Sequence, residues 1–152
     1  MKMAAKYRII PTHRLKLVEI SGKTDYKELE NLFYEYIRDP DFEPSLRILA
    51  DLRGMTDAIT GLMEIRKLKL LYQYAYRDTV GVVDVVIVPK AGVANRAARA
   101  FALFMRDKRP LKIQITSSWA EAHKMLGVGV DVTNDLSENR ETAQILAWNA
   151  QR

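Results

Sequence analysis

The chain contains no cysteine and only two histidines, His13 and His123. Disulfide bonds, thiolate metal sites and cysteine nucleophiles are therefore excluded. Neither histidine belongs to a Ser-His-Asp or His-x-x-x-His pattern, so no catalytic triad or zinc site is indicated, and we expect structural or solvent-facing roles for both. No Gly-x-Gly-x-x-Gly or Gly-Lys-[Ser/Thr] loop is present, which argues against a nucleotide site. We expect a protein without catalytic residues, metal or cofactor, and thus not an enzyme.

The chain also lacks a long apolar segment. Its most apolar run lies around Val85–Val88 and is far shorter than the roughly 20 residues that a membrane-spanning helix needs. The N-terminal segment Met1–Lys6 is too short and too polar for a signal peptide. Together with the absence of cysteine, these features lead us to expect a cytoplasmic protein.

A single globular domain fits the length of 152 residues, of which 48% are hydrophobic and 28% charged. The 24 basic residues exceed the 19 acidic ones, which gives a net charge of +5. Because the basic residues are spread along the chain, we expect a solvated basic surface and no nucleic-acid binding. The helix expected over Ile59–Arg77 is both basic and aromatic, so a weak association with an anionic membrane surface stays open.

Alternating and helical apolar patterns predict the secondary structure. The expected order is a hairpin over Tyr7–Ile10 and Arg14–Ile20, a helix over Asp25–Arg38, a strand over Leu46–Asp51 followed by a turn at Arg53-Gly54, a helix over Ile59–Arg77, a strand over Val82–Val88, a helix over Val93–Arg109, a strand over Leu111–Thr116 and a helix over Ser118–Leu126. This alternation predicts an α/β fold: a mostly parallel sheet of four or five strands, with an antiparallel N-terminal hairpin and helices packed on it.

The last 25 or so residues are expected to form a separate extension. We predict one domain over residues 1–127 and a C-terminal extension over 128–152. Within the extension, residues 137–150 fit a helix whose apolar strip includes Trp148. Such a strip must be covered, either by the chain's own domain or by a second subunit, so a homodimer stays open.

Three segments in a fixed order carry a resemblance to a known family. They are Asp39–Phe42 followed by Leu46–Thr56, then Val86–Pro89 followed by Ala98–Phe101, then Ser118–Ala122 with Leu126-Gly127. Over residues 7–127 the chain resembles the SpoIIAA-like members of the STAS superfamily, which are related to anti-sigma factor antagonists. The resemblance implies a sheet of four or five strands and an architecture close to that of CRAL-TRIO lipid-binding domains. It also implies either binding of small apolar ligands or association with membranes, or, as in the better-known antagonists, binding to a kinase-like protein partner that is switched by phosphorylation of the antagonist.

The phosphorylation switch of the antagonists is only partly retained. The corresponding region reads Asp57-Ala58-Ile59-Thr60-Gly61-Leu62, in which Gly61-Leu62 matches and Thr60 is the nearest hydroxyl. The adjacent acid and the paired hydroxyls of the family motif are missing. Thr60 is therefore either a phosphate acceptor near a helix N-terminus or an ordinary helix N-cap.

Two binding sites follow from these patterns. Ligands of open parallel sheets bind at the carboxyl ends of the strands, which predicts a partner-binding rim formed by Asp51, Arg53, Gly54, Asp57, Thr60 and Lys90. Alternatively, Asp51 only caps the turn by accepting hydrogen bonds from backbone N–H groups. A cavity between the second and third helices and the sheet would instead be lined by Leu71, Tyr74, Phe101 and Met105. The first site favours a non-enzymatic regulatory module that binds a protein partner. The second favours a carrier or sensor of a small apolar or lipid-like ligand.

Overall fold

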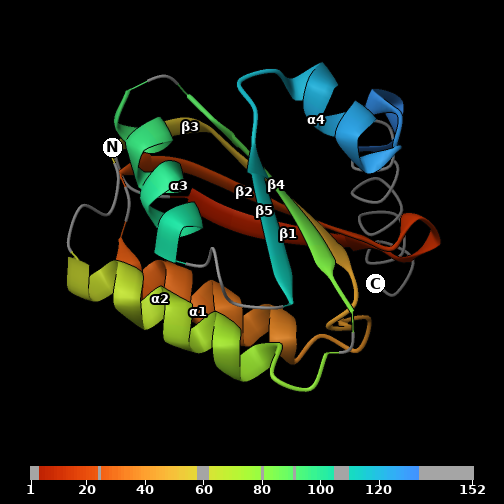
Figure 1. The fold of residues 1–152 in the computed structure, drawn as a ribbon, viewed down its shortest axis with the longest axis horizontal. Coiled ribbons are helices and arrows are strands. Elements are labelled where there is room, and N and C mark those ends of the chain that lie inside the picture. Colours follow the sequence, from red (N-terminus) through yellow and green to blue (C-terminus); the bar gives the residue numbers. More distant parts are fainter. Residues whose placement is uncertain are drawn as a thin grey trace, which may run out of the picture.

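The computed structural model describes residues 4–23, 25–57, 62–79, 81–90, 92–104 and 110–133. Five strands form one sheet in the order in which they occur in the chain: β1 (Ala4–Ile10), β2 (Leu15–Lys23), β3 (Arg47–Asp57), β4 (Val83–Pro89) and β5 (Leu111–Ile115). β1 runs antiparallel to β2, and the other neighbours are parallel (Figure 1). This arrangement confirms the predicted fold class, a mostly parallel α/β sheet with an antiparallel N-terminal hairpin.

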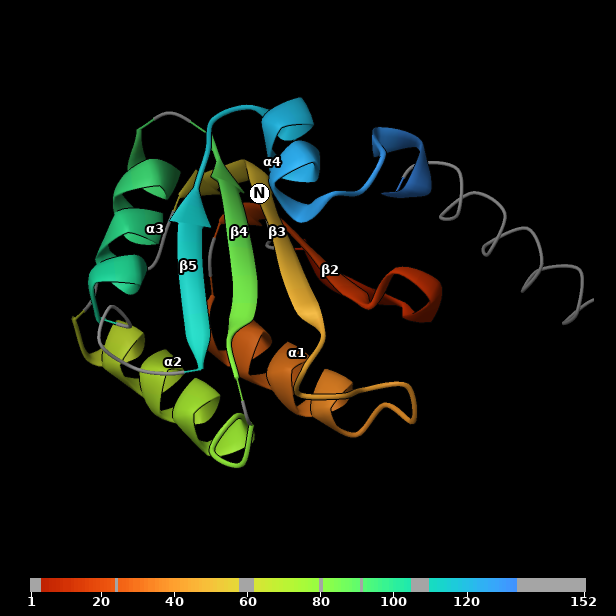
Figure 2. The same cartoon turned by 45° about the vertical axis from the view of Figure 1, so that its right-hand side comes forward.

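Helices cover the two faces of the sheet unequally. α1 (Tyr26–Ile37), α2 (Leu62–Ala75) and α3 (Val93–Phe104) lie together on one face, and α4 (Trp119–Leu126) packs on the other (Figures 1 and 2). Alternate residues of β2 separate into the two layers, because successive side chains of a strand point to opposite faces. Val18 faces α1–α3, whereas Leu15 and Leu17 face α4.

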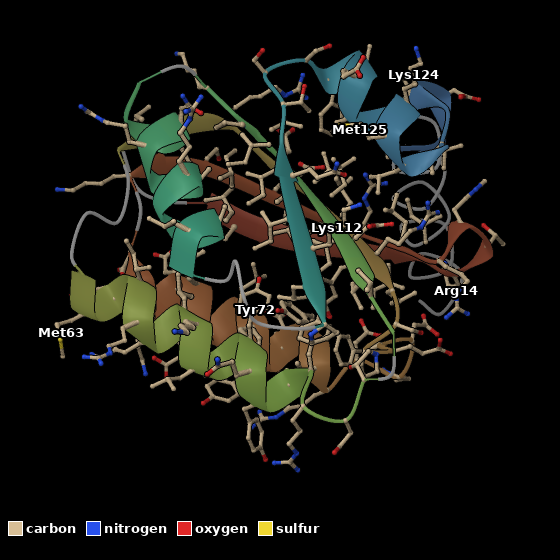
Figure 3. The ribbon with its side chains drawn as sticks, viewed as in Figure 1. Arg14, Met63, Tyr72, Lys112, Lys124 and Met125 are labelled. Atoms are coloured by element: carbon tan, nitrogen blue, oxygen red, sulfur yellow. The ribbon has the colours of Figure 1, made fainter. Side chains whose placement is uncertain are left out.

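A short turn joins β1 to β2. Pro11–His13 form one turn of 3-10 helix, and Arg14 follows in the left-handed conformation with φ of 49°. Arg14 lies at the tip of this hairpin (Figure 3), where its backbone N–H donates to the carbonyl of Pro11. The pairing then continues from Ile10 with Leu15 to Ala4 with Ser21. The hairpin therefore extends three residues further toward the N-terminus than the alternating pattern indicates.

β3 is longer than the sequence pattern predicts, and the turn predicted at Arg53-Gly54 is wrong. Gly54 is a strand residue that pairs with Ser21, and the pairing with β2 extends to Asp57. A Cβ placed on Gly54 would lie 2.9 Å from the Cβ of Ser21. Glycine at this position permits the close approach of two strands, rather than a reversal of the chain.

Two described helices begin at residue types that favour the N-cap position. Asp25 caps α1 by accepting a hydrogen bond from the N–H of Lys27. Ser118 caps α4 by accepting from the N–H of Glu121, and Gly127 ends that helix with φ of 66°. α2 ends at Ala75, two residues before the predicted end. The predicted last turn of α3, over residues 105–109, lies outside the described residues.

The first residues after α4 pack on the domain. Val128 is buried, and Val132 packs against the cluster under α4. The Thr133 hydroxyl lies 2.9 Å from Nε2 of His123, and Arg8 donates to the Thr133 carbonyl. Residues 128–133 thus contact the domain beside α4. The predicted helix with Trp148 lies outside the described residues.

Replacing Gly54 by alanine should destabilise the fold. The added methyl group would press on Ser21 across the β2–β3 pair, and overpacking of this kind costs about 1–3 kcal/mol. Denaturant unfolding of Gly54→Ala measures the loss. The double variant Gly54→Ala/Ser21→Gly, compared with Ser21→Gly alone, should recover most of it. An equal loss in both backgrounds would refute the steric explanation.

Candidate functional site

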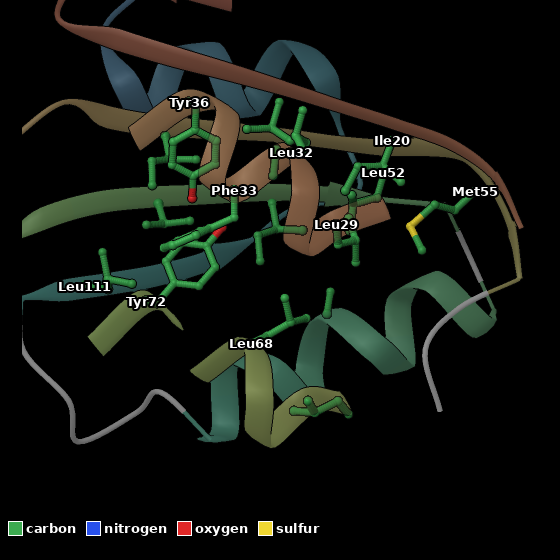
Figure 4. A pocket seen from close by; sticks show the side chains of 17 residues that line it. Ile20, Leu29, Leu32, Phe33, Tyr36, Leu52, Met55, Leu68, Tyr72 and Leu111 are labelled. Atoms are coloured by element: carbon green, nitrogen blue, oxygen red, sulfur yellow. The ribbon is translucent and has the colours of Figure 1, made fainter. Parts of the chain in front are cut away.

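An apolar cavity of about 150 Å³ lies between the sheet and the layer formed by α1, α2 and α3. Figure 4 shows side chains of α1, α2 and the sheet around this space. The cavity is lined by Val18, Ile20, Leu29, Leu32, Phe33, Tyr36, Ile48, Ala50, Leu52, Met55, Ile65, Leu68, Tyr72, Val85, Ile87, Ala98 and Leu111. A space of this size with apolar walls admits a benzene-sized molecule.

The alternation of the strands brings these side chains to one face. Val18 and Ile20 come from β2, Ala50 and Leu52 from β3, each pair two residues apart, as the period of a strand requires. The opposite wall includes Ala98 on α3. Both alanines end in a single methyl group, which leaves space that a branched side chain would fill.

Two tyrosines provide the only side-chain hydroxyl groups among the lining residues. Tyr36 on α1 is only 2% exposed, and its hydroxyl interacts with that of Tyr72 on α2. The hydroxyls of Tyr36 and Tyr72 point toward one another (Figure 4). Burial, followed by the proximity of Tyr72 and Tyr76, raises the pKa of Tyr36 well above its usual value, so this phenol stays protonated.

A buried lysine lies beside this site. Lys16 on β2 is 0% exposed, and its Nζ lies 3.3 Å from the ring centroid of Tyr36 and 3.4 Å from the hydroxyl oxygen of Tyr76. The ring of Phe42 is 5.7 Å from the same nitrogen. Burial lowers the pKa of Lys16 well below its usual value, because the charged form loses its hydration. Lys16 does not itself line the cavity, but it shares Tyr36 with it.

Two of the four predicted pocket residues, Leu71 and Tyr74, are not among the described residues that line this cavity. Tyr74 is 60% exposed and lies under the guanidinium of Arg77, and Leu71 packs into the core without lining the cavity. The side chain of Phe101, and Met105 altogether, lie outside the described residues. The prediction chose the wrong side of α2 as the side that faces the cavity. Apolar residues occur on more than one side of this helix, and those that face inward are Ile65, Leu68, Tyr72 and Tyr76.

The prediction also omitted α1 from the helices that line the cavity. α1 contributes Leu29, Leu32, Phe33 and Tyr36, although the expected cavity lay between α2, α3 and the sheet. In Figure 3, Met63 extends outward from α2, whereas Tyr72 lies on the side of that helix toward the sheet. The solvent-exposed side of α2 therefore includes apolar side chains.

The predicted rim is only partly described. Near the middle of β3, Asp51 accepts hydrogen bonds from Nε of Arg53 at 2.9 Å and from Nη2 at 3.0 Å. The Arg53 guanidinium carbon also lies 4.0 Å from the ring centroid of Trp119, the first residue of α4. Lys90 is exposed and follows Pro89, the partner of Leu52 in the β3–β4 register, so it lies at the same edge of the sheet.

The remaining rim residues stay predictions or have a different role. Gly54 lies within β3, where its close contact with Ser21 explains why the residue at this position is a glycine. The side chain of Asp57 and the whole of Thr60 lie outside the described residues, so the proposed phosphate acceptor is not placed. His123 is buried, with Nδ1 2.8 Å from the Trp119 carbonyl, which agrees with the expected structural role.

Sequence reasoning missed Lys16, Tyr36 and the contact of Arg53 with Trp119. The alternation of the strand places Lys16 on the same face as Val18 and Ile20, two apolar residues, and this pattern could have predicted that Lys16 is buried. A strand flanked by two others and covered on both faces buries most of its side chains, and the first four residues of β2, Lys16 included, are all buried. The Arg53–Trp119 contact joins residues 66 positions apart, which no local pattern indicates.

No protein-family model and no curated protein matches the chain. Among the described helices, none has the length and apolar character needed to cross a membrane. The described residues also contain no cluster of three or more acidic or histidine side chains arranged to hold a metal ion.

Replacing Lys16 by methionine should stabilise the protein at neutral pH. The unfolded lysine binds a proton below about pH 10.5, whereas the buried one does so only at lower pH. Between these values unfolding takes up a proton, so the stability of the unmodified protein rises with pH. The advantage of Lys16→Met should therefore be largest at low pH and shrink as the pH rises toward 10.

Thermal unfolding across this pH range provides the measurement, with Lys112→Met on the exposed part of β5 as the control. Both variants keep every tyrosine, so phenol ionisation cancels in the comparison. A stability difference that does not change with pH would contradict the lowered pKa of Lys16. A destabilised Lys16→Met would show that the contacts of the amine with Tyr36 and Tyr76 outweigh its burial.

Proposed function

We propose that this domain binds a small apolar molecule in the cavity between α1–α3 and the sheet. The cavity itself is the observation that carries the proposal, because protein interiors are ordinarily close-packed. Leaving 150 Å³ empty costs about 3–4 kcal/mol at roughly 24 cal/mol per Å³. A ligand that restores these contacts recovers part of that free energy.

The size of the cavity narrows the class of ligand. A space of about 150 Å³ holds one ring or a short branched chain, and a long acyl chain would require the helices to separate. The apolar ligand is therefore compact and not lipid-like. This proposal agrees with the resemblance to SpoIIAA-like STAS proteins, for which apolar ligands are one of the implied functions. It requires no catalytic residue.

Titration with toluene, followed by methyl NMR, tests the proposal. We expect saturable shifts of the methyl signals of lining residues such as Leu32 and Ile65. The variant Ala98→Leu should fill the space, abolish these shifts and raise the free energy of unfolding by about 1 kcal/mol. Ala120→Leu, at an exposed position of α4, is the matched control and should bind toluene unchanged.

Two results would contradict the proposal. The first is the absence of saturable shifts in the unmodified protein at toluene concentrations up to its solubility. The second is binding that survives Ala98→Leu while that variant remains folded, because the ligand would then occupy another site.

A protein partner at the rim is a second candidate. The observation that favours it is the exposed Arg53, which Asp51 and Trp119 hold in one orientation. Arginine and tryptophan are the residue types that most often dominate binding energy at protein interfaces, and a fixed side chain loses less entropy on binding. Whether Thr60 regulates such a partner by phosphorylation remains a prediction.

Arg53→Ala should weaken the binding of such a partner by about tenfold or more, as expected for a central interface residue. Titration calorimetry with each candidate partner measures the affinity. Lys112→Ala, on the exposed part of β5, removes an equal charge elsewhere and should leave the affinity unchanged. Equal affinities for Arg53→Ala and the unmodified protein would exclude the rim as the interface.

A further inference from the structure

We propose that the side of α2 that faces away from the sheet binds the surface of an anionic lipid bilayer. This surface, the outer stripe, consists of exposed residues of α2 and one that follows the helix: Met63, Arg66, Lys67, Leu70, Tyr74 and Arg77. The proposal does not depend on the cavity, because α2 lines the cavity with other residues, Ile65, Leu68 and Tyr72.

The first observation is a line of exposed apolar side chains. Met63, Leu70 and Tyr74 are 61%, 60% and 60% exposed, and they are three of the seven large apolar side chains exposed among the described residues. Their spacing of three to four residues per turn, or twice that, places them on one side of the helix. Single apolar side chains on a surface are ordinary, whereas a contiguous group marks a contact surface.

The second observation is the positive charge of the outer stripe. Arg66, Lys67 and Arg77 are exposed on it, and Asp78, whose Oδ2 lies 3.4 Å from Nε of Arg77, offsets only part of this charge. The single acidic residue of α2, Glu64, is half-buried. Basic side chains can lay their apolar stems along an apolar surface and extend their charged groups to lipid phosphates.

The two neighbours of α2 differ in charge. α3 lies beside α2 (Figures 1 and 2), exposes Arg96 and Arg99, and contains no acidic residue. Leu103 of the same helix is 66% exposed. α1, in contrast, has three glutamates and one lysine. The attraction to an anionic surface is therefore concentrated on α2 and α3.

The chemistry of the outer stripe favours a bilayer over a nucleic acid. Unpaired bases bind by stacking on aromatic faces, but Tyr74 is the only ring of the outer stripe, and the guanidinium carbon of Arg77 lies 4.5 Å from its centroid. The other apolar members are aliphatic, and Met63 extends outward from α2 (Figure 3). Such side chains can enter the boundary between the headgroups and the acyl chains of a bilayer.

Sedimentation with lipid vesicles tests the proposal. We expect the unmodified protein to bind phosphatidylcholine vesicles that contain about 40% phosphatidylserine, and not to bind vesicles of phosphatidylcholine alone. Arg66→Gln should weaken this binding about fivefold, because it removes one attraction to the anionic surface. Leu70→Gln should weaken it about fivefold or more, because it removes an inserted apolar side chain.

The matched controls lie on the α4 side of the sheet. Met125→Gln changes an apolar side chain of α4 that is 40% exposed, and Lys112→Gln removes an exposed positive charge from β5. Both variants should bind the anionic vesicles as the unmodified protein does. Circular dichroism checks that each of the four variants is folded.

A fluorescent label identifies the surface that touches the bilayer without removing a charge. Because the chain has no cysteine, Met63→Cys and Met125→Cys each provide a single position for an environment-sensitive label. On addition of the anionic vesicles, we expect the emission of the label at position 63 to shift to shorter wavelength. The emission of the label at position 125 should not change.

Three results would overturn the inference. The first is that the unmodified protein does not bind the anionic vesicles. The second is that binding is the same in folded Arg66→Gln and Leu70→Gln as in the unmodified protein, or that the label at position 63 does not shift. The third is that the protein ignores the vesicles but binds single-stranded RNA or polyglutamate through Arg66, because the outer stripe would then bind a different kind of macromolecule.

Discussion

Tyr36 is the side chain on which the helical layer of this protein depends. From α1 it covers Lys16 on β2, meets Phe33, Phe42 and Tyr7 through its ring, and ends in the wall of the cavity. One phenol thus joins the hairpin, α1 and the loop that precedes β3. Its position explains how the core tolerates Lys16, which forms no ion pair with a carboxylate among the described residues. The amine meets the face of a π-system and a phenol oxygen in place of water.

The cavity lies between the sheet and the same helical layer, which is formed by α1, α2 and α3. Three helices share one face of the sheet, whereas α4 and residues 128–133 cover the other. Large aromatic side chains from α1 and α2 hold the helices apart at one end, and the alanines at positions 50 and 98 leave space near the centre. The rim lies at the carboxyl edge of the strands and uses different residues. The two candidate sites can therefore be changed separately by substitution.

Much of the fold could be predicted from the sequence. The order of the strands and helices follows from local periodicity, and the parallel pairing follows from the right-handed crossover between successive strands. The caps at Asp25 and Ser118 were visible as single residues. The length of β3 could not be predicted, because a glycine after an apolar run commonly marks a turn, and the pairing of Gly54 with Ser21 and of Met55 with Gly22 is a contact between distant residues. The cavity depends on which stripe of α2 faces inward, and apolar residues on several sides of that helix left the choice open.

The central claim is that the space between α1–α3 and the sheet is an open, apolar cavity. Xenon tests this directly, because it enters dry cavities of this size by dispersion contacts alone. In a crystal pressurised with xenon, we expect one ordered atom in contact with Leu32, Ala50 and Ala98. A core that has closed over this space, or that holds ordered water there and excludes xenon, would contradict the account.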